Sequence, residues 1–186
     1  PTAMAMATLD EVAPGRAAIA IGTGNPLFLQ ESGRAVEKPV RAMREFADAL
    51  RRLWTGESVH ADGEFVKLAG ARLAFTPSAA IPISIAAIGP DMLRLAGRIG
   101  DGVALSAGLS TESVRQSIAL CAEGAAKAGR DPAAIRRAGY VFFGASPDAK
   151  EAMDAVRRKL AFVMRNKFLG ANIEAAIKEI TADLPV

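Results

Sequence analysis

Cysteine, histidine, tryptophan and tyrosine each occur only once in this chain of 186 residues. The lone Cys121 cannot form an internal disulfide, which fits a reducing compartment, and its apolar helical surroundings favour core packing over a nucleophilic role. The lone His60 has no carboxylate or cysteine at metal-ligand spacing, so we expect it at the surface. These absences argue against a disulfide scaffold, a metal site and histidine-based catalysis.

Long apolar runs and a strong charge imbalance are missing as well. No run approaches the roughly 20 residues of a membrane span, and the chain does not open with the pattern of a signal peptide. Lys and Arg exceed Asp and Glu by only 23 − 20 = 3, and the basic residues are scattered without aromatic neighbours. We therefore expect a cytoplasmic protein that binds neither a membrane nor nucleic acid.

Hydrophobic residues make up 51% of the chain, which at this length is enough for one sizeable core but not for two. A single domain over residues 1–186 is the expectation. Its most informative stretch is residues 81–93, where an apolar run at 83–87 with β-forming residues gives way to a helical pattern through Gly89 and Pro90. A buried strand is therefore predicted to feed a helix through one tight turn.

That turn has the build of a phosphate-binding site. Gly89 has no side chain and Pro90 suits the first turn of a helix, so an anion could approach the backbone N–H groups of Gly89, Asp91 and Met92. Two observations leave open the alternative that this turn binds no ligand. A strand, a small turn and a helix also form the ordinary joint of parallel α/β proteins, and the Asp91 carboxylate would repel a phosphate.

A second glycine turn supports a ligand site. Residues 17–21 form a short apolar run that is typical of a strand buried on both faces, and it leads into Gly22, Thr23, Gly24 and Asn25. The glycines permit unusual backbone conformations, while Thr23 and Asn25 offer side-chain hydrogen bonds.

The remaining sequence predicts an alternation of strands and helices. In the first half of the chain we expect a helix at 3–12, an amphipathic helix at 38–54 in which Trp54 serves packing, and a hairpin at about 57–75 that turns at Asp62 and Gly63. In the second half we expect a strand at 103–106, a helix capped by Ser110 or Thr111 and a strand at 140–143. A helix starting at 146–148 and a helical stretch at 171–182 follow. Four strand-helix units imply a parallel sheet with right-handed crossovers. Ligands bind at the carboxyl ends of such strands, where residues 22–25, 87–90 and 106–109 would gather, whether the sheet is open or closed into a barrel.

An ordered series of short motifs resembles the bacterial luciferase-like family. The motifs lie at residues 9–12, 15–16, 22–25, 38–39, 70–73, 81–82, 86–90 and 101–103. Within that family, the chain is most similar to the branch with deazaflavin-dependent methylenetetrahydromethanopterin reductases and flavin-dependent monooxygenases. The resemblance implies an α/β fold of the TIM-barrel type, whose full size is about 300 residues or more. Because the chain matches only the fourth to the seventh strand, we expect a partial barrel of about four β-α units with an inserted hairpin, as a fragment lacking the first strands.

The same resemblance implies a cofactor and the residues that hold it. The cofactor would be FMN or the deazaflavin coenzyme F420, used for hydride transfer or monooxygenation of a small organic substrate. The implied cofactor-binding residues are Gly22, Thr23, Gly24, Asn25, Ala86, Ala87, Ile88, Gly89, Pro90 and Ser106. No side chain stands out as a catalytic acid or base, no metal is expected, and a homodimer is expected.

Two other functions remain open from the sequence. The chain could be a flavin-binding or structural remnant without turnover, whose unpaired strand edges would promote self-association. It could also be a phosphate-sugar isomerase on another barrel, but such an enzyme needs a carboxylate base at a strand end, and only Asp91 and Glu31 lie near the glycine turns.

Overall fold

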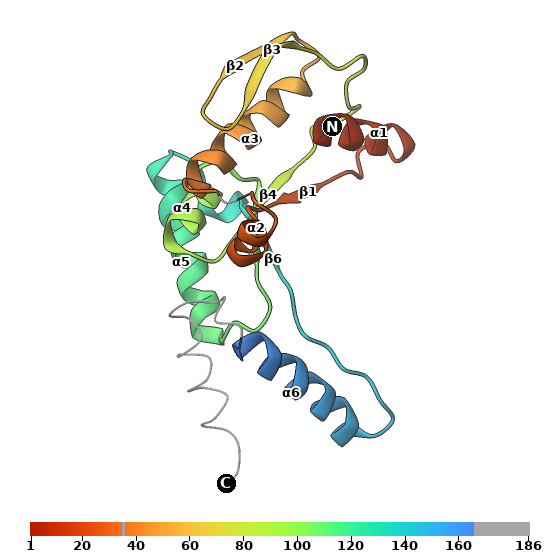
Figure 1. The fold of residues 1–186 in the computed structure, drawn as a ribbon, viewed down its shortest axis with the longest axis vertical. Coiled ribbons are helices and arrows are strands. Elements are labelled where there is room, and N and C mark those ends of the chain that lie inside the picture. The colour runs from red at the N-terminus through yellow and green to blue at the C-terminus, as the bar shows by residue number, and fades with distance from the viewer. Residues whose placement is uncertain (35, 166–186) are drawn as a thin grey trace.

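A computed structural model describes residues 1–34 and 36–165 of the chain. Its elements in order are α1 (Thr2–Val12), β1 (Ile19–Ile21), α2 (Pro26–Glu31), α3 (Pro39–Leu53), β2 (Val59–Asp62), β3 (Lys67–Ala71), β4 (Ile83–Ala87), α4 (Pro90–Ile99), β5 (Gly102–Leu105), α5 (Thr111–Lys127), a 3-10 turn (Pro132–Ala134), β6 (Arg136–Gly139) and α6 (Ala149–Arg165). Figure 1 shows these elements along the chain. No helix in the described part is both long enough and apolar enough to cross a bilayer.

The principal sheet is parallel throughout, in the order β1-β4-β5-β6. The register sets Ile21 opposite Ile85 and sets Leu105 opposite both Ala87 and Gly139. The carboxyl ends of all four strands therefore lie along one edge of the sheet. The predicted parallel sheet is confirmed, and its first three predicted strands coincide with or overlap β1, β4 and β5.

The core lies where the two central strands meet the helices that cover them. Ile83 and Ile85 of β4 are fully buried, and Leu50 of α3 and Leu93 of α4 are at most 2% exposed. At the end of α3, the Trp54 indole N–H donates to the carbonyl of Ala3 at 3.0 Å. The predicted packing role of this tryptophan is confirmed, because it joins α3 to α1.

Helices α4 and α5 touch backbone to backbone. A Cβ atom at Gly97 would overlap the Cys121 carbonyl oxygen, and a Cβ at Gly124 would overlap the Arg94 carbonyl oxygen. Neither overlap could be relieved by rotating a side chain. Cys121 is buried in this contact, as expected from the sequence, and burial raises the pKa of its thiol.

The expected hairpin forms as an antiparallel pair, β2 and β3, apart from the main sheet. Glu45 of α3 holds its tip, because its carboxylate accepts the backbone N–H groups of Phe65 at 2.8 Å, Val66 at 3.2 Å and Glu64 at 3.3 Å. These bonds, led by the one from Phe65, lower the pKa of Glu45 to about 2. His60 is exposed on β2, as expected.

The prediction of a fourth strand at residues 140–143 is wrong. The strand is β6, and after one further bond from the Tyr140 N–H to the Leu105 carbonyl the chain leaves the sheet, because β5 ends at Leu105. Tyr140, Val141 and Phe143 are 68%, 84% and 86% exposed. All four residues of β6 are exposed and two of them are arginines, so the strand carries no apolar signal in the sequence.

The last described helix, α6, follows a long extended segment and stands beyond the sheet (Figure 1). It begins at Ala149, close to the predicted start, and the Ser146 hydroxyl accepts the Asp148 N–H before it. The helical stretch expected at 171–182 lies outside the described residues.

Candidate functional site

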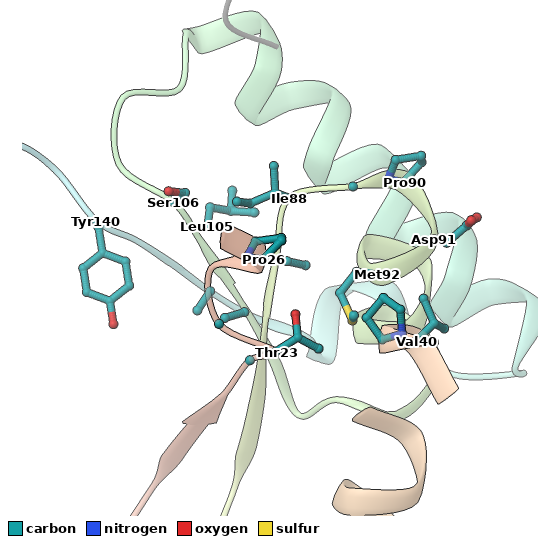
Figure 2. A pocket seen from close by; sticks show the side chains of 17 residues that line it. Thr23, Pro26, Val40, Ile88, Pro90, Asp91, Met92, Leu105, Ser106 and Tyr140 are labelled. Carbon is teal, nitrogen blue, oxygen red and sulfur yellow. The ribbon is translucent and has the colours of Figure 1, made fainter. Parts of the chain in front are cut away.

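A cavity of about 740 Å³ opens at the carboxyl ends of the parallel strands (Figure 2). Every candidate residue from the sequence except Asn25 lines it: Gly22, Thr23, Gly24, Ala86, Ala87, Ile88, Gly89, Pro90 and Ser106. Asn25 lies outside the lining and precedes α2, where its carbonyl accepts the Leu29 N–H at 2.9 Å. The two glycine turns, about 65 residues apart in the chain, thus share one cavity.

Lining residues that the sequence did not single out come mostly from the elements around those turns. They are Pro26, Pro39, Val40, Ala104, Leu105 and Tyr140. Residues 39 and 40 begin α3, and only the tertiary fold brings this helix start to the same cavity as the start of α4 (Figure 2). Tyr140 reaches the cavity because the chain leaves the sheet at that residue.

The loop after β1 depends on its glycines. A Cβ atom at Gly22 would lie 3.0 Å from the Cβ of Ala86, which is tighter than ordinary packing allows. Gly24 has a φ of +80°, in the left-handed region that favours glycine. The loop can therefore lie directly against β4, where it forms one wall of the cavity.

The opposite wall is the start of α4. Gly89 is its N-cap residue in an extended conformation, Pro90 occupies the first turn, and no side chain caps this end. The first-turn N–H groups of Asp91 and Met92 are left for solvent or a ligand, at the end of the helix where the macrodipole favours a negative charge. A Cβ at Gly89 would meet no atom within 4 Å, so the backbone here borders open space.

The Asp91 carboxylate has a cationic partner on its own helix. It pairs with Arg94 at 3.4 Å, and its side chain is 81% exposed. Figure 2 shows it directed outward, away from the centre of the cavity. The repulsion that the sequence suggested between this carboxylate and a phosphate is therefore reduced.

Acid-base chemistry has few side chains to use here. Asp91 and Tyr140 are the ionisable residues in the lining. The groups with shifted pKa values, namely Asp10, Glu45, Cys121 and Glu123, all lie outside it. Within residues 1–34 and 36–165, no group of three or more His, Cys, Asp or Glu could hold a metal. The cavity is equipped to bind and orient a ligand with an anionic end.

Comparison with known proteins decides the family. Residues 1–183 match the family model described as luciferase-like monooxygenase. The chain belongs to this family. The resemblance inferred from the ordered motifs is thereby confirmed.

Two curated relatives of this luciferase-like chain are a reductase and a dehydrogenase by name. It is 38% identical over 165 residues to the 5,10-methylenetetrahydromethanopterin reductase of Archaeoglobus fulgidus, covering 88% of this chain and 48% of the relative. It is 35% identical over 161 residues to the F420-dependent glucose-6-phosphate dehydrogenase of Nocardia farcinica, covering 83% and 48%.

A solved structure supports the same fold. The coenzyme F420 dependent tetrahydromethanopterin reductase of Methanopyrus kandleri superposes with a TM-score of 0.79 at 28% identity, covering 88% of this chain and 51% of that one. The fold is therefore that of the luciferase-like TIM-barrel proteins, and the described part is a partial barrel. The chain spans about half the length of the curated relatives it matches.

Proposed function

We propose that the cavity binds coenzyme F420 and that the chain belongs to an F420-dependent oxidoreductase acting on a small organic substrate. The observation that carries this proposal is the meeting of the α4 start and the loop at residues 22–24 in one cavity. Relatives at 35% identity or more include a methylenetetrahydromethanopterin reductase and F420-dependent dehydrogenases, which favours the deazaflavin over FMN.

The residues present fit such a coenzyme. The uncapped start of α4 offers backbone N–H groups to a phosphate, and the space that a Cβ at Gly89 would enter leaves room for it. Ile88, Ala104 and Leu105 provide apolar surface for a planar ring system, while Thr23 and Ser106 offer hydroxyl groups at the same cavity.

In this proposal the bound coenzyme would carry the hydride, accepting it from a reduced substrate or returning it in the reverse reaction, and the protein would supply binding and orientation. Asp91 and Met92 hold the phosphate through their N–H groups. Thr23 and Ser106 fix the ring and the substrate by hydrogen bonds. The scarcity of ionisable side chains in the lining suits hydride transfer, because that chemistry does not require a protein acid or base at every step.

The test is a titration of the purified chain with coenzyme F420 and, separately, with FMN, followed by the fluorescence of each compound. We expect saturable binding of F420 and weaker binding of FMN. Preferential binding of FMN would mean that the cofactor of this cavity is a flavin and not the deazaflavin. Absence of saturable binding by both compounds would overturn the proposal.

A catalytically inactive coenzyme-binding protein is the second candidate. A lining in which only Asp91 and Tyr140 can ionise is equally compatible with binding alone. The two candidates differ in turnover: an oxidoreductase bleaches oxidised F420 when a secondary alcohol, a sugar phosphate or a reduced pterin is added, whereas a binding protein leaves the absorbance unchanged.

Self-association is also part of the proposal. In the described sheet, β1 and β6 each pair on one side only, and the apolar residues Tyr140, Val141 and Phe143 are exposed next to β6. Open strand edges and exposed apolar patches promote pairing between chains. We expect dimers or larger species in sedimentation velocity, and a stable monomer at micromolar concentration would contradict this.

A further inference from the structure

A second cavity, of about 380 Å³, lies between the start of α3 and the outer side of α4. We call it the basic groove. Its polar lining consists of four cationic side chains: Lys38, Arg41, Arg44 and Arg98. Its apolar lining is Pro39, Val40 and Leu95, and no acidic residue contributes to it.

Two of the four cations already have partners. Lys38 pairs with Glu64 at 2.9 Å, and Arg41 pairs with Glu64 at 2.7 Å and with Glu45 at 2.9 Å. The Glu45 carboxylate also accepts three backbone N–H groups of the hairpin. Glu45 and Glu64 are therefore already paired with Lys38, Arg41 or the hairpin backbone.

Arg44 and Arg98 have no hydrogen bond or ion pair with any residue in the described part of the chain. Both side chains are exposed, one on α3 and the other near the end of α4. Guanidinium groups that line one cavity without a carboxylate among them repel each other, and a bound anion would relieve that repulsion. The basic groove therefore carries an uncompensated positive charge.

The basic groove continues the coenzyme cavity. Pro39 and Val40 line both. Arg98 lies eight residues after Pro90 on the same helix, which corresponds to about 12 Å along its axis. A ligand with a phosphate at Gly89 would reach Arg98 if it carried an extended chain of a few residues.

We propose that the basic groove binds the carboxylate-bearing glutamate tail of the deazaflavin coenzyme, beyond its phosphate. The carboxylates pair with Arg44 and Arg98, while the methylene groups of the tail lie on Pro39, Val40 and Leu95. FMN ends at its phosphate and has nothing to place there. The inference rests on the proposed function, and it assigns specificity for the longer coenzyme to two arginines outside the cavity.

The experiment compares coenzyme F420 that carries several glutamate residues with the same coenzyme trimmed of its tail. Dissociation constants are measured from the quenching of coenzyme fluorescence at low and high salt. Three proteins are used: the unchanged chain, the double variant Arg44→Gln with Arg98→Gln, and a control double variant, Arg16→Gln with Arg72→Gln. The control removes the same charge from exposed arginines that line neither cavity.

We expect the unchanged chain and the control to prefer the tailed coenzyme by about three- to tenfold at low salt, since exposed ion pairs are individually weak, and to lose that preference as salt screens them. The Arg44 and Arg98 variant should bind both forms equally and bind the trimmed form as tightly as the unchanged chain does.

The possible failures are distinguishable. If the unchanged chain binds the two forms equally, or if the control loses the preference as fully as the Arg44 and Arg98 variant, the tail does not occupy the basic groove and the proposed function stands. If neither form binds to the unchanged chain, the proposed function and the inference fall together.

Discussion

The two ends of helix α4 use glycine for opposite purposes. At its start, Gly89 borders open space, and an added Cβ would touch nothing within 4 Å. In its last turns, Gly97 is pressed against α5, and an added Cβ would overlap the backbone at Cys121. One end borders open space at the cavity and the other is closed by packing, so in the proposed function a Gly→Ala substitution should affect binding at the first end and folding at the second.

The largest effect is expected from Gly97→Ala. Its methyl group would lie against the Cys121 carbonyl and 2.7 Å from the Ala125 nitrogen, so the two helices would have to separate. Such overpacking should lower the free energy of unfolding by about 2–3 kcal/mol, as measured by urea denaturation. The matched control is Gly139→Ala, where a Cβ would also meet nothing within 4 Å. Equal stability of the two variants would contradict the backbone contact between α4 and α5.

At the other end, Gly89→Ala should leave the fold intact and weaken coenzyme binding. The methyl group would occupy the space assigned to the phosphate and disturb its bonds to the first-turn N–H groups. Hydrogen bonds to a charged group are worth about 1.5–3 kcal/mol, so we expect affinity for F420 to fall about tenfold or more while the melting temperature stays unchanged. Unchanged affinity for F420 in this variant would contradict the proposal that the phosphate binds at the start of α4.

The hairpin tip gives a different kind of test, because its contact with α3 involves neither glycine of α4. In Glu45→Gln, the neutral amide accepts the hairpin N–H groups more weakly than the carboxylate does, and we expect faster hydrogen exchange at Phe65 and Val66.

The same contact has a defined pH dependence. Because the pKa of Glu45 is lowered to about 2 from an ordinary 4.5, its stabilising contribution is fully present above pH 4.5 and is lost as the pH falls toward 2. Protection of these amides should fall over that window in the unchanged chain and should not do so in Glu45→Gln.

The smallest effect concerns Cys121, which reports whether α4 and α5 stay closed. Burial raises the pKa of its thiol, so the fraction of reactive thiolate at neutral pH is low in the folded chain. We expect slow labelling by a thiol reagent at pH 8, faster labelling in Gly97→Ala, and the unchanged slow rate in Gly89→Ala. Rapid labelling of the folded, unchanged chain would show that the helix pair opens.

The sequence predicted the cavity well because its signals are local. Apolar runs at 17–21 and 83–87 ending in glycine indicated buried strands whose loops share one edge, and β4 was located at its observed bounds. In contrast, β6 was placed four residues too late, since an exposed edge strand with Arg136 and Arg137 lacks the apolar pattern that marks a buried strand.

Tertiary contacts account for the remaining misses. Gly97 and Gly124 resemble ordinary helical residues until α4 and α5 are set against each other. Arg44 and Arg98 lie 54 positions apart and appeared as scattered surface charge, because only the packing of α3 on α4 brings them into one groove. Neither feature has a periodic signal that a single sequence could reveal.

The single tryptophan and the single tyrosine occupy separate places in this fold. Trp54 is bonded to the Ala3 carbonyl where α3 meets α1, while Tyr140 faces the cavity. The chain therefore carries two native optical labels: the emission of the indole reports on the contact between α3 and α1, and the absorbance of the phenol reports on the cavity, without any dye being attached.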